Sequence, residues 1–319
     1  MKAAFFTQYG PPEVLSVREV EKPAPNENEV LVRVYATTVN RTDCANLTAQ
    51  PFIMRFINGL TKPRQPIPGT DFAGEIEAIG GNVQSFKVGD KVWGFGDYGI
   101  KSQAEYLCFP EGKAIARFPD NLTYEQAAAS LEGAHYAYHF INKVKLNPSQ
   151  KVLVNGATGA IGSALLQFLK YHGLYVTAVC NTKNIGLIKS LGADKIIDYT
   201  RQDFTTDDEK YDFIFDAVGK STFGRCKPLL KAKGTYISSE LGPGSQNVFL
   251  ALWGLWASGK KVIFPIPSDI RGSMAFIRDL IEKGKFRPVI DRTYPLEEIA
   301  EAYRFVLTGQ KTGNVVITM

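Results

Sequence analysis

The pattern of hydrophobic and polar residues divides the chain into three zones. Up to about residue 121, short runs such as EVLVRVYATTVN and DFAGEIEAIG are separated by Gly, Pro, Asn and Asp, which is typical of β-strands joined by turns. From about 122 to 260, apolar runs such as KVLVN, YVTAVC and YDFIFDA alternate with helical patterns, which predicts an α/β domain with a parallel, doubly wound sheet. Residues 261–319 hold two helical patterns and one strand, too few for a separate core. We therefore expect residues 122–260 to be inserted into an all-β domain built from 1–121 and 261–319.

Composition and charge exclude several classes of protein. Of the 319 residues, 45% are hydrophobic and 22% are charged, which are globular proportions. No run reaches the roughly 20 apolar residues of a membrane span, and the start, MKAAFFTQYG, has no secretory pattern, so we expect a cytoplasmic protein without a membrane partner. The net charge of +5 is spread along the chain without a basic block. Nucleic acid is therefore not an expected partner, whereas a small anionic ligand suits this charge.

Cysteine and histidine spacing gives no metal site. Cys44, Cys108, Cys180 and Cys226 are single and far apart, so they form no zinc-binding pair motif or disulfide framework. His135 and His139 are four residues apart on a predicted helix, but no glutamate of an HExxH motif lies between them. We expect no metal ligand set.

A glycine-rich turn is the strongest chemical signal. It joins the strand KVLVN to a helix whose apolar face is marked by Ile161, Leu165 and Phe168. Glycine lets the backbone approach a pyrophosphate, and the helix N-terminus offers free N–H groups. The spacing is GxxGxxG rather than GxGxxG, so a turn without a ligand is the alternative. The expected dinucleotide contacts in this turn are Gly156, Thr158, Gly159, Ala160, Ile161 and Gly162.

The residues after the next strand indicate which dinucleotide binds. A site for NAD carries Asp or Glu there to bind the ribose 2′-hydroxyl, but this chain has Asn181, Thr182 and Lys183. Lysine can neutralise a 2′-phosphate, and the two polar residues can donate hydrogen bonds, so NADPH is the expected cofactor. Tyr199, after the third strand, is a candidate contact for the adenosine end. An exposed loop lysine and a packing tyrosine are the alternatives.

These motifs together resemble a known family. In order and spacing, GTDFAGEIEAIG, VGDKVWGF, VLVNGATGAIGSALLQ, LGADKIIDY, YDFIFDAVG and TGNVVITM resemble the medium-chain dehydrogenase/reductase superfamily, and within it the zinc-free quinone oxidoreductase branch. The resemblance implies a central Rossmann domain, a discontinuous GroES-like β-barrel catalytic domain, and an active site between them. A homodimer is compatible with it.

The zinc-free assignment rests on two regions. Zinc-dependent relatives carry a Cys near the end of VYATTVNRTDC and a His-Glu pair after the glycine of PIPGTDFAG. This chain has Thr42 and Asp43 in the first region, and Thr70 and Asp71 in the second. Hydride transfer from NADPH to a quinone, or to the C=C bond of an enone or alkenal, is then the expected reaction.

The resemblance also implies site residues. Asn40 matches a residue beside the nicotinamide in similar enzymes, Asp43 matches a carboxylate of the same loop that either caps it or acts as an acid, and His135 is either a proton donor or structural. Further cofactor contacts are implied at Ala217, Val218, Leu241, Phe264, Ile266 and Asn314.

Several functions stay open at this stage. The region after Asn40 has no tyrosine of the kind that enoyl-thioester reductases use as a proton donor, but reduction of an enoyl thioester or another carbonyl compound is an alternative. A non-catalytic NADPH-binding protein, crystallin-like or RNA-binding, is another. The run PFIMRFINGL predicts either a short helix at the substrate pocket or a packed insertion.

Overall fold

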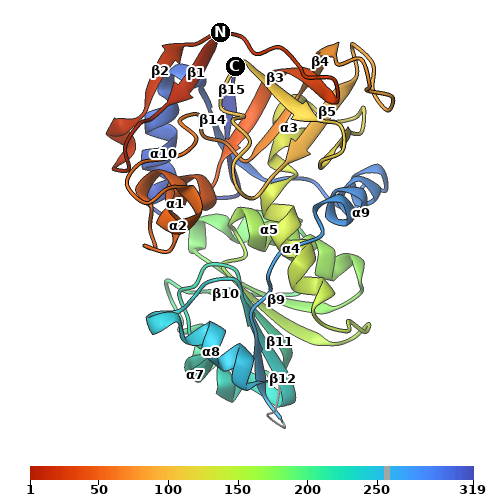
Figure 1. The fold of residues 1–319 in the computed structure, drawn as a ribbon. Coiled ribbons are helices and arrows are strands. Elements are labelled where there is room, and N and C mark those ends of the chain that lie inside the picture. The colour runs from red at the N-terminus through yellow and green to blue at the C-terminus, as the bar shows by residue number, and fades with distance from the viewer. Residues whose placement is uncertain (255–258) are drawn as a thin grey trace. The chain divides into compact units, whose positions relative to one another are not determined.

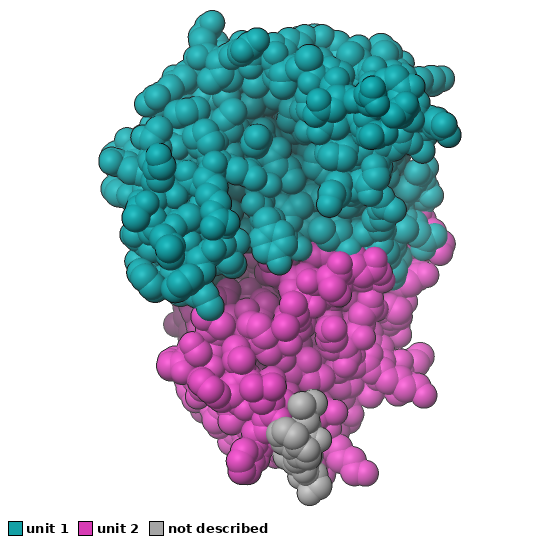
Figure 2. All heavy atoms as spheres, viewed as in Figure 1, with its two compact units in different colours: residues 1–132, 270–282, 288–319 teal, residues 133–269, 283–287 magenta. Residues whose placement is uncertain are grey.

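The computed structural model describes residues 1–254 and 259–319, which form two compact units. Unit 1 contains residues 1–132, 270–282 and 288–319, and unit 2 contains residues 133–269 and 283–287 (Figure 2). The chain therefore leaves unit 1 after Glu132 and returns to it at Ile270, apart from residues 283–287, which belong to unit 2.

Unit 1 is built on a seven-stranded sheet around β3 (Figure 1). β3 pairs antiparallel with β4, β6 and β15, so that Thr38 lies opposite Val316 and the two ends of the chain share one sheet. A second, two-stranded sheet is formed by β1 and β2. The strands are β1 (Lys2–Phe5), β2 (Ser16–Glu19), β3 (Glu29–Val39), β4 (Asp71–Ile79), β5 (Lys91–Phe95), β6 (Tyr106–Pro110), β7 (Ile115–Arg117), β14 (Ile290–Pro295) and β15 (Asn314–Thr318).

Alternation along β3 explains how this sheet is buried. Val30, Val32 and Val34 share a face and pack with Phe72 and Phe109 of neighbouring strands. Because successive side chains of a strand point to opposite faces, this one face carries a continuous core.

Helices interrupt the zone that the sequence pattern predicted as all-β. The run PFIMRFINGL does contain a short helix, α2, whereas its place at a substrate pocket stays a prediction. Apolar side chains of α1 and α10, including Leu47 and Tyr303, pack in a common cluster with Ile317 of β15. The helical segments of unit 1 are η1 (Pro12–Val14), α1 (Arg41–Thr48), α2 (Met54–Asn58), α3 (Tyr124–Ala129), α9 (Ile270–Glu282), η6 (Leu296–Glu298) and α10 (Ile299–Leu307).

Unit 2 contains six parallel strands in the order β10-β9-β8-β11-β12-β13. This is the strand order of a doubly wound Rossmann sheet, in which two halves run outward from the central pair. The predicted α/β fold class is confirmed. The strands are β8 (Lys151–Asn155), β9 (Tyr175–Cys180), β10 (Lys195–Asp198), β11 (Tyr211–Asp216), β12 (Leu230–Ser238) and β13 (Lys261–Ile263).

Helices connect these strands, and the strand centres are buried. Leu153, Val179 and Ile214, from three of the strands, belong to one buried apolar cluster, as expected for parallel strands covered on both faces. The helical segments are α4 (Glu132–Asn142), α5 (Ala160–Tyr171), η2 (Thr182–Asn184), α6 (Ile185–Ser190), η3 (Phe204–Thr206), α7 (Phe223–Cys226), η4 (Lys227–Leu229), η5 (Pro243–Ser245) and α8 (Gln246–Trp253).

The two units divide the chain at other residues than the sequence pattern suggested. Residues 122–132 belong to unit 1, where α3 packs against β3 and β4. Residues 261–269 belong to unit 2, because β13 extends its sheet by pairing with β12. Residues 283–287 also join unit 2, where Gln167 and the Arg287 backbone exchange two hydrogen bonds of 3.0 Å.

Over the described ranges, 1–254 and 259–319, no helix combines the length and the apolar character needed to cross a bilayer.

Candidate functional site

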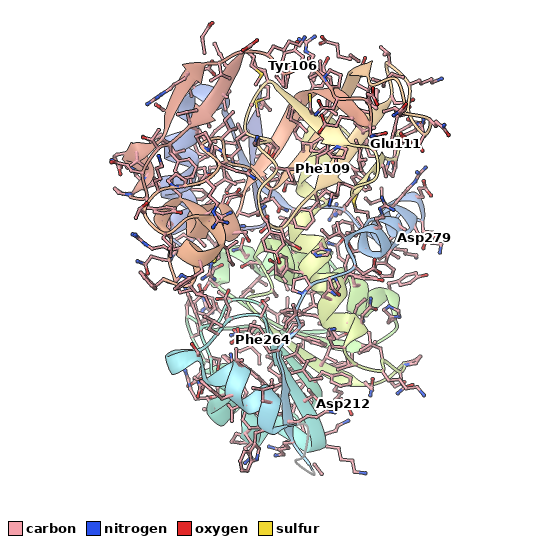
Figure 3. The ribbon with its side chains drawn as sticks, in the orientation of Figure 1. Tyr106, Phe109, Glu111, Asp212, Phe264 and Asp279 are labelled. Carbon is pink, nitrogen blue, oxygen red and sulfur yellow. The ribbon has the colours of Figure 1, made fainter. Side chains whose placement is uncertain are left out.

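The predicted cofactor residues of unit 2 gather at one edge of its sheet. Because all six strands are parallel, the loops that follow them emerge at their carboxyl ends. In Figure 3, Asp212 marks the amino end of β11 and Phe264 follows the carboxyl end of β13. The residues after the six strands at this edge are Gly156, Thr158, Gly159, Ala160, Ile161, Gly162, Asn181, Thr182, Lys183, Tyr199, Ala217, Val218, Leu241, Phe264 and Ile266.

The fold does not require glycine equally at the three glycine positions of the first loop. Gly156 has φ +78°, and a Cβ there would lie 2.7 Å from the Val218 Cβ; a Cβ on Gly162 would lie 2.1 Å from the Gly156 oxygen. Both positions therefore require glycine for the fold itself. At Gly159, an added Cβ would have only the Gly156 oxygen within 4 Å among the described residues, at 3.8 Å. The fold alone does not require glycine at 159, and an added side chain would project into open space.

Gly159 is also the N-cap of α5. It offers no side chain to cap the first turn, and the first N–H groups of a helix lack partners within the helix. Together with the helix dipole they favour an anion. The turn and α5 therefore fit the pyrophosphate of a dinucleotide.

A buried aspartate that the sequence reasoning missed holds the neighbouring loop. The Asp216 Oδ1 atom accepts hydrogen bonds from Asn155 Nδ2 at 3.1 Å and from the backbone N–H groups of Val218 and Gly219 at 3.2 and 3.0 Å. Its Oδ2 atom accepts from the Tyr236 hydroxyl at 2.8 Å. Asp216 thus fixes Val218 against Gly156. The signal was its position as the last residue of an apolar strand.

The loop after β9 is exposed and carries the predicted 2′-phosphate contacts. Lys183 forms no ion pair within the part of the chain that the structure describes. Asn181 Oδ1 accepts from Asn184 Nδ2 at 2.9 Å, so this hydrogen bond uses the amide oxygen of Asn181 and not its N–H groups. Tyr199 is 54% exposed.

One feature of this loop was not expected from the sequence. Asp198, the last residue of β10, lies opposite Cys180 in the sheet register and accepts a hydrogen bond from the Thr182 hydroxyl. It also accepts from the Thr200 backbone at 3.0 Å, and Arg201 lies 3.6 Å away. An acidic group therefore borders the predicted 2′-phosphate site from the neighbouring strand, and the Thr182 hydroxyl is already used as a donor.

Unit 1 contains a buried polar cluster centred on Glu132. Glu132 accepts hydrogen bonds from Asn40 Nδ2 at 3.1 Å, Thr42 Oγ1 at 2.7 Å and Thr70 Oγ1 at 2.7 Å. The two regions in which zinc-dependent relatives carry ligands are thus joined here by one carboxylate. Burial raises the pKa of Glu132, while the hydroxyls of Thr42 and Thr70 act in the opposite direction.

Asn40 and Asp43 are both tied into this cluster. Asn40 precedes α1 as its N-cap, and its backbone N–H donates to Asp43 Oδ2 at 2.8 Å. The Asn40 amide also donates to Thr38 Oγ1 at 2.6 Å. This geometry gives Asp43 the capping role, and its pKa is raised well above the usual range by burial and by Glu132. Contact of either residue with a nicotinamide or substrate stays a prediction.

Further ionisable groups of unit 1 titrate near neutral pH. Asp71 accepts from the Thr38 N–H at 2.8 Å, and burial raises its pKa to about 7. Burial and Glu132 raise the pKa of Asp97 to about 7 as well. Burial lowers the pKa of Lys311 to about 8, although Glu132 acts in the opposite direction. Three ionisable groups that interact electrostatically with Glu132 therefore have pKa values of about 7 or 8.

His135 and Asn314 lie in other surroundings. His135, on α4 in unit 2, is buried, and its ring lies 4.6 Å from that of His139. Burial, followed by His139, lowers the pKa of His135 to about 3, so the imidazole is neutral at physiological pH. Asn314 begins β15 in unit 1, and its amide donates to the Val289 oxygen at 3.0 Å. Roles for both in binding or catalysis stay predictions.

Among the residues that the structure describes, no three His, Cys, Asp or Glu side chains come together in a way that suits a metal ion.

Comparison with known proteins agrees with this geometry. Residues 26–120 match the family model for the alcohol dehydrogenase GroES-like domain, and residues 191–317 match the model for zinc-binding dehydrogenase. The fold of a quinone oxidoreductase from Coxiella burnetii, 25% identical, superimposes with a TM-score of 0.88 and covers 100% of this chain and 99% of that one.

Curated relatives extend over nearly the whole chain. A chloroplastic quinone oxidoreductase from Triphysaria versicolor is 30% identical over 94% of this chain and 92% of its own length. A chloroplastic NADPH-dependent alkenal/one oxidoreductase from Arabidopsis thaliana is 28% identical over 99% of this chain and 79% of its own length. The chain belongs to the quinone oxidoreductase-like branch of the medium-chain dehydrogenase/reductase superfamily.

Proposed function

We propose that the chain is an NADPH-dependent oxidoreductase that transfers hydride or electrons to a quinone or an activated alkene without zinc. The observation that carries the proposal is the turn from Gly156 to Gly162, where the fold requires two glycines and leaves open space at the third. The relatives named as a quinone oxidoreductase and an alkenal/one oxidoreductase support the same reaction class.

The residues present fit a nicotinamide dinucleotide. Gly159 and the first turn of α5 would bind the pyrophosphate, and Val218, held by Asp216, would support the loop beside it. Leu241, Phe264 and Ile266 extend this edge with apolar side chains suited to a ring. When bound, the reduced nicotinamide supplies the hydride; the protein positions the acceptor and excludes water.

NADPH is preferred over NADH in this proposal because of Lys183. Its exposed ammonium group has no carboxylate partner among the described residues, and Asn181 keeps amide donors for a phosphate. Asp198 acts against the 2′-phosphate, but its charge is partly offset by Arg201 and by hydrogen bonds from Thr182 and Thr200. The balance favours the 2′-phosphate only as long as Lys183 is present.

Unit 1 would handle protons and orient the polar loop. Reduction of an enone or of a quinone by a hydride needs one further proton, whereas reduction of a quinone by two single electrons needs two protons. Asp71 and Asp97, with pKa values of about 7, hold and release protons near neutral pH. Glu132 keeps the Asn40 amide in place through its 3.1 Å hydrogen bond.

The test is an NADPH oxidation assay with a panel of acceptors. The panel contains quinones, enones, alkenals, an enoyl thioester and a simple ketone, each with the protein before and after dialysis against a chelator. We expect turnover of a quinone, enone or alkenal that is unchanged by the chelator. If only the thioester or the ketone is turned over, the proposed substrate class, a quinone or an activated alkene, is wrong. If NADPH binds but no acceptor is turned over, the chain is a cofactor-binding protein.

A further inference from the structure

The proposed reaction assigns no role to a short apolar segment on the surface of unit 1. It comprises residues 51–64, includes α2, and lies beside α1 (Figure 1). Phe52 is 63% exposed and Phe56 is 61% exposed, and their rings meet edge to face at 5.9 Å. The exposed apolar side chains of the segment are Phe52, Ile53, Phe56, Ile57 and Leu60. Contiguous apolar residues at the surface of a soluble domain indicate an interaction site.

The segment is fixed on the body of unit 1. The Tyr9 hydroxyl donates to the Gly59 oxygen at 2.7 Å, and Asn58 Nδ2 donates to Asn46 Oδ1 at 2.8 Å. The Arg64 N–H donates to the Asn58 oxygen at 2.8 Å. The apolar side chains are therefore presented by an ordered backbone, so that binding does not first have to order the segment.

The charged residues of segment 51–64 are all positive. Arg55, Lys62 and Arg64 lie within the segment, and the sequence has no Asp or Glu from residue 44 to residue 70. None of the three cations forms an ion pair among the residues that the structure describes, whereas other surface arginines do, such as Arg117 with Asp90. Segment 51–64 thus combines exposed apolar side chains with cations that form no ion pair among the described residues. This combination is complementary to a surface that offers both negative charge and an apolar interior.

We propose that segment 51–64 docks the protein onto an anionic phospholipid surface. The aromatic and aliphatic side chains enter the boundary between headgroups and acyl chains, and the three cations contact anionic headgroups. A symmetric contact between two copies would instead bring six cations together, which costs free energy. The proposal replaces the sequence-based expectation of no membrane partner, and it is independent of the proposed reaction.

Co-sedimentation of the full chain with vesicles tests the proposal without turnover. The vesicles are phosphatidylcholine alone, or phosphatidylcholine mixed with phosphatidylglycerol. We expect binding to the mixed vesicles, weaker binding at high salt, and little binding to phosphatidylcholine alone. The double variant Lys62→Glu/Arg64→Glu should lose about tenfold or more in affinity, since each basic residue contributes about a factor of five. The double variant Phe52→Ser/Phe56→Ser should also lose about tenfold or more, because binding strength scales with the apolar area that enters the boundary.

The matched control is Val88→Ser/Leu307→Ser, which removes two exposed apolar side chains elsewhere on unit 1. It should bind vesicles as the wild type does, and thermal unfolding should show that all three variants are folded. The proposal is overturned if the wild type ignores mixed vesicles, or if either segment variant binds as the wild type does. It is also overturned if ultracentrifugation shows a dimer that Phe52→Ser/Phe56→Ser dissociates, because the segment would then join copies of the chain.

Discussion

Thr70 Oγ1 donates a hydrogen bond of 2.7 Å to Glu132 Oε2 and thereby ties the residue before β4 to the first residue of α4. The same carboxylate accepts from Asn40 and Thr42, so one side chain holds two loops of unit 1. Its three donors are buried or partly buried, and a donor left without an acceptor there costs free energy.

Replacement of Glu132 tests this relationship. Glu132→Ala should lower the free energy of unfolding by about 1–3 kcal/mol, because buried donors lose their acceptor. Glu132→Gln keeps one carbonyl oxygen and should lose less. The measurement is urea unfolding, with the exposed Glu298→Ala as the matched control. An alanine variant as stable as the control would show that the cluster does not hold these loops.

The raised pKa of Asp71 predicts a pH dependence of stability. Its pKa is about 7 in the folded chain against an ordinary value of 3.8, so between these values the folded state binds a proton that the unfolded state has released. This group's contribution to stability therefore falls as the pH rises from about 4 to 7.

The variant Asp71→Asn removes this titration while an amide can still face Thr38. Its free energy of unfolding should fall less steeply over the same pH interval than that of the wild type. Chemical unfolding at a series of pH values gives the slope. A variant with the same slope as the wild type would mean that Asp71 is ionised throughout.

Replacement of two glycines of the same turn by alanine should affect two different properties, stability at Gly162 and NADPH affinity at Gly159. In Gly162→Ala, the new Cβ would lie 2.1 Å from the Gly156 oxygen, so the variant should lose stability. In Gly159→Ala, the Cβ meets nothing closer than 3.8 Å, so the variant should fold normally. Its methyl group would occupy the space where a pyrophosphate approaches α5, and NADPH affinity should fall by about tenfold or more.

Thermal unfolding and a fluorescence titration with NADPH separate the two effects. If Gly159→Ala binds NADPH as the wild type does, the turn is not the phosphate site. A stable Gly162→Ala would mean that the backbone at Gly156 shifts to admit the methyl group.

The parts that were predictable from sequence are those with local signals. The strand and helix periodicity around residues 151–171 predicted β8, the turn and α5, and the alternation beyond it predicted a parallel sheet. The Glu132 cluster had no such signal, because its donors lie 62 to 92 residues away in sequence. Asp198 likewise meets Thr182 only through the register of β9 and β10. Contacts of this kind depend on how distant segments come together in the fold, and this cannot be inferred from local patterns in a single sequence.

In the proposed site, the selectivity between NADPH and NADH depends on the opposing charges of Lys183 and Asp198. A charge-assisted hydrogen bond is worth roughly 1.5–3 kcal/mol, so Lys183→Ala should raise the NADPH dissociation constant by about ten- to a hundredfold. NADH lacks the 2′-phosphate and should bind the variant nearly as before. Asn181→Asp adds a carboxylate and should move the preference further toward NADH, whereas Asp198→Asn should strengthen NADPH binding. Lys189→Ala, an exposed lysine of α6, is the matched control.

Calorimetric titration of each variant with both cofactors measures these changes. The design separates charge from fold because Lys183 and Lys189 are both exposed and lie six residues apart. Equal losses for NADPH and NADH in Lys183→Ala would place the lysine outside the 2′-phosphate site. If the wild type prefers NADH, the repulsion of the 2′-phosphate by the Asp198 carboxylate at the end of β10 is stronger than its attraction by Lys183. The register of β9 and β10, rather than the loop sequence, would then determine which cofactor binds.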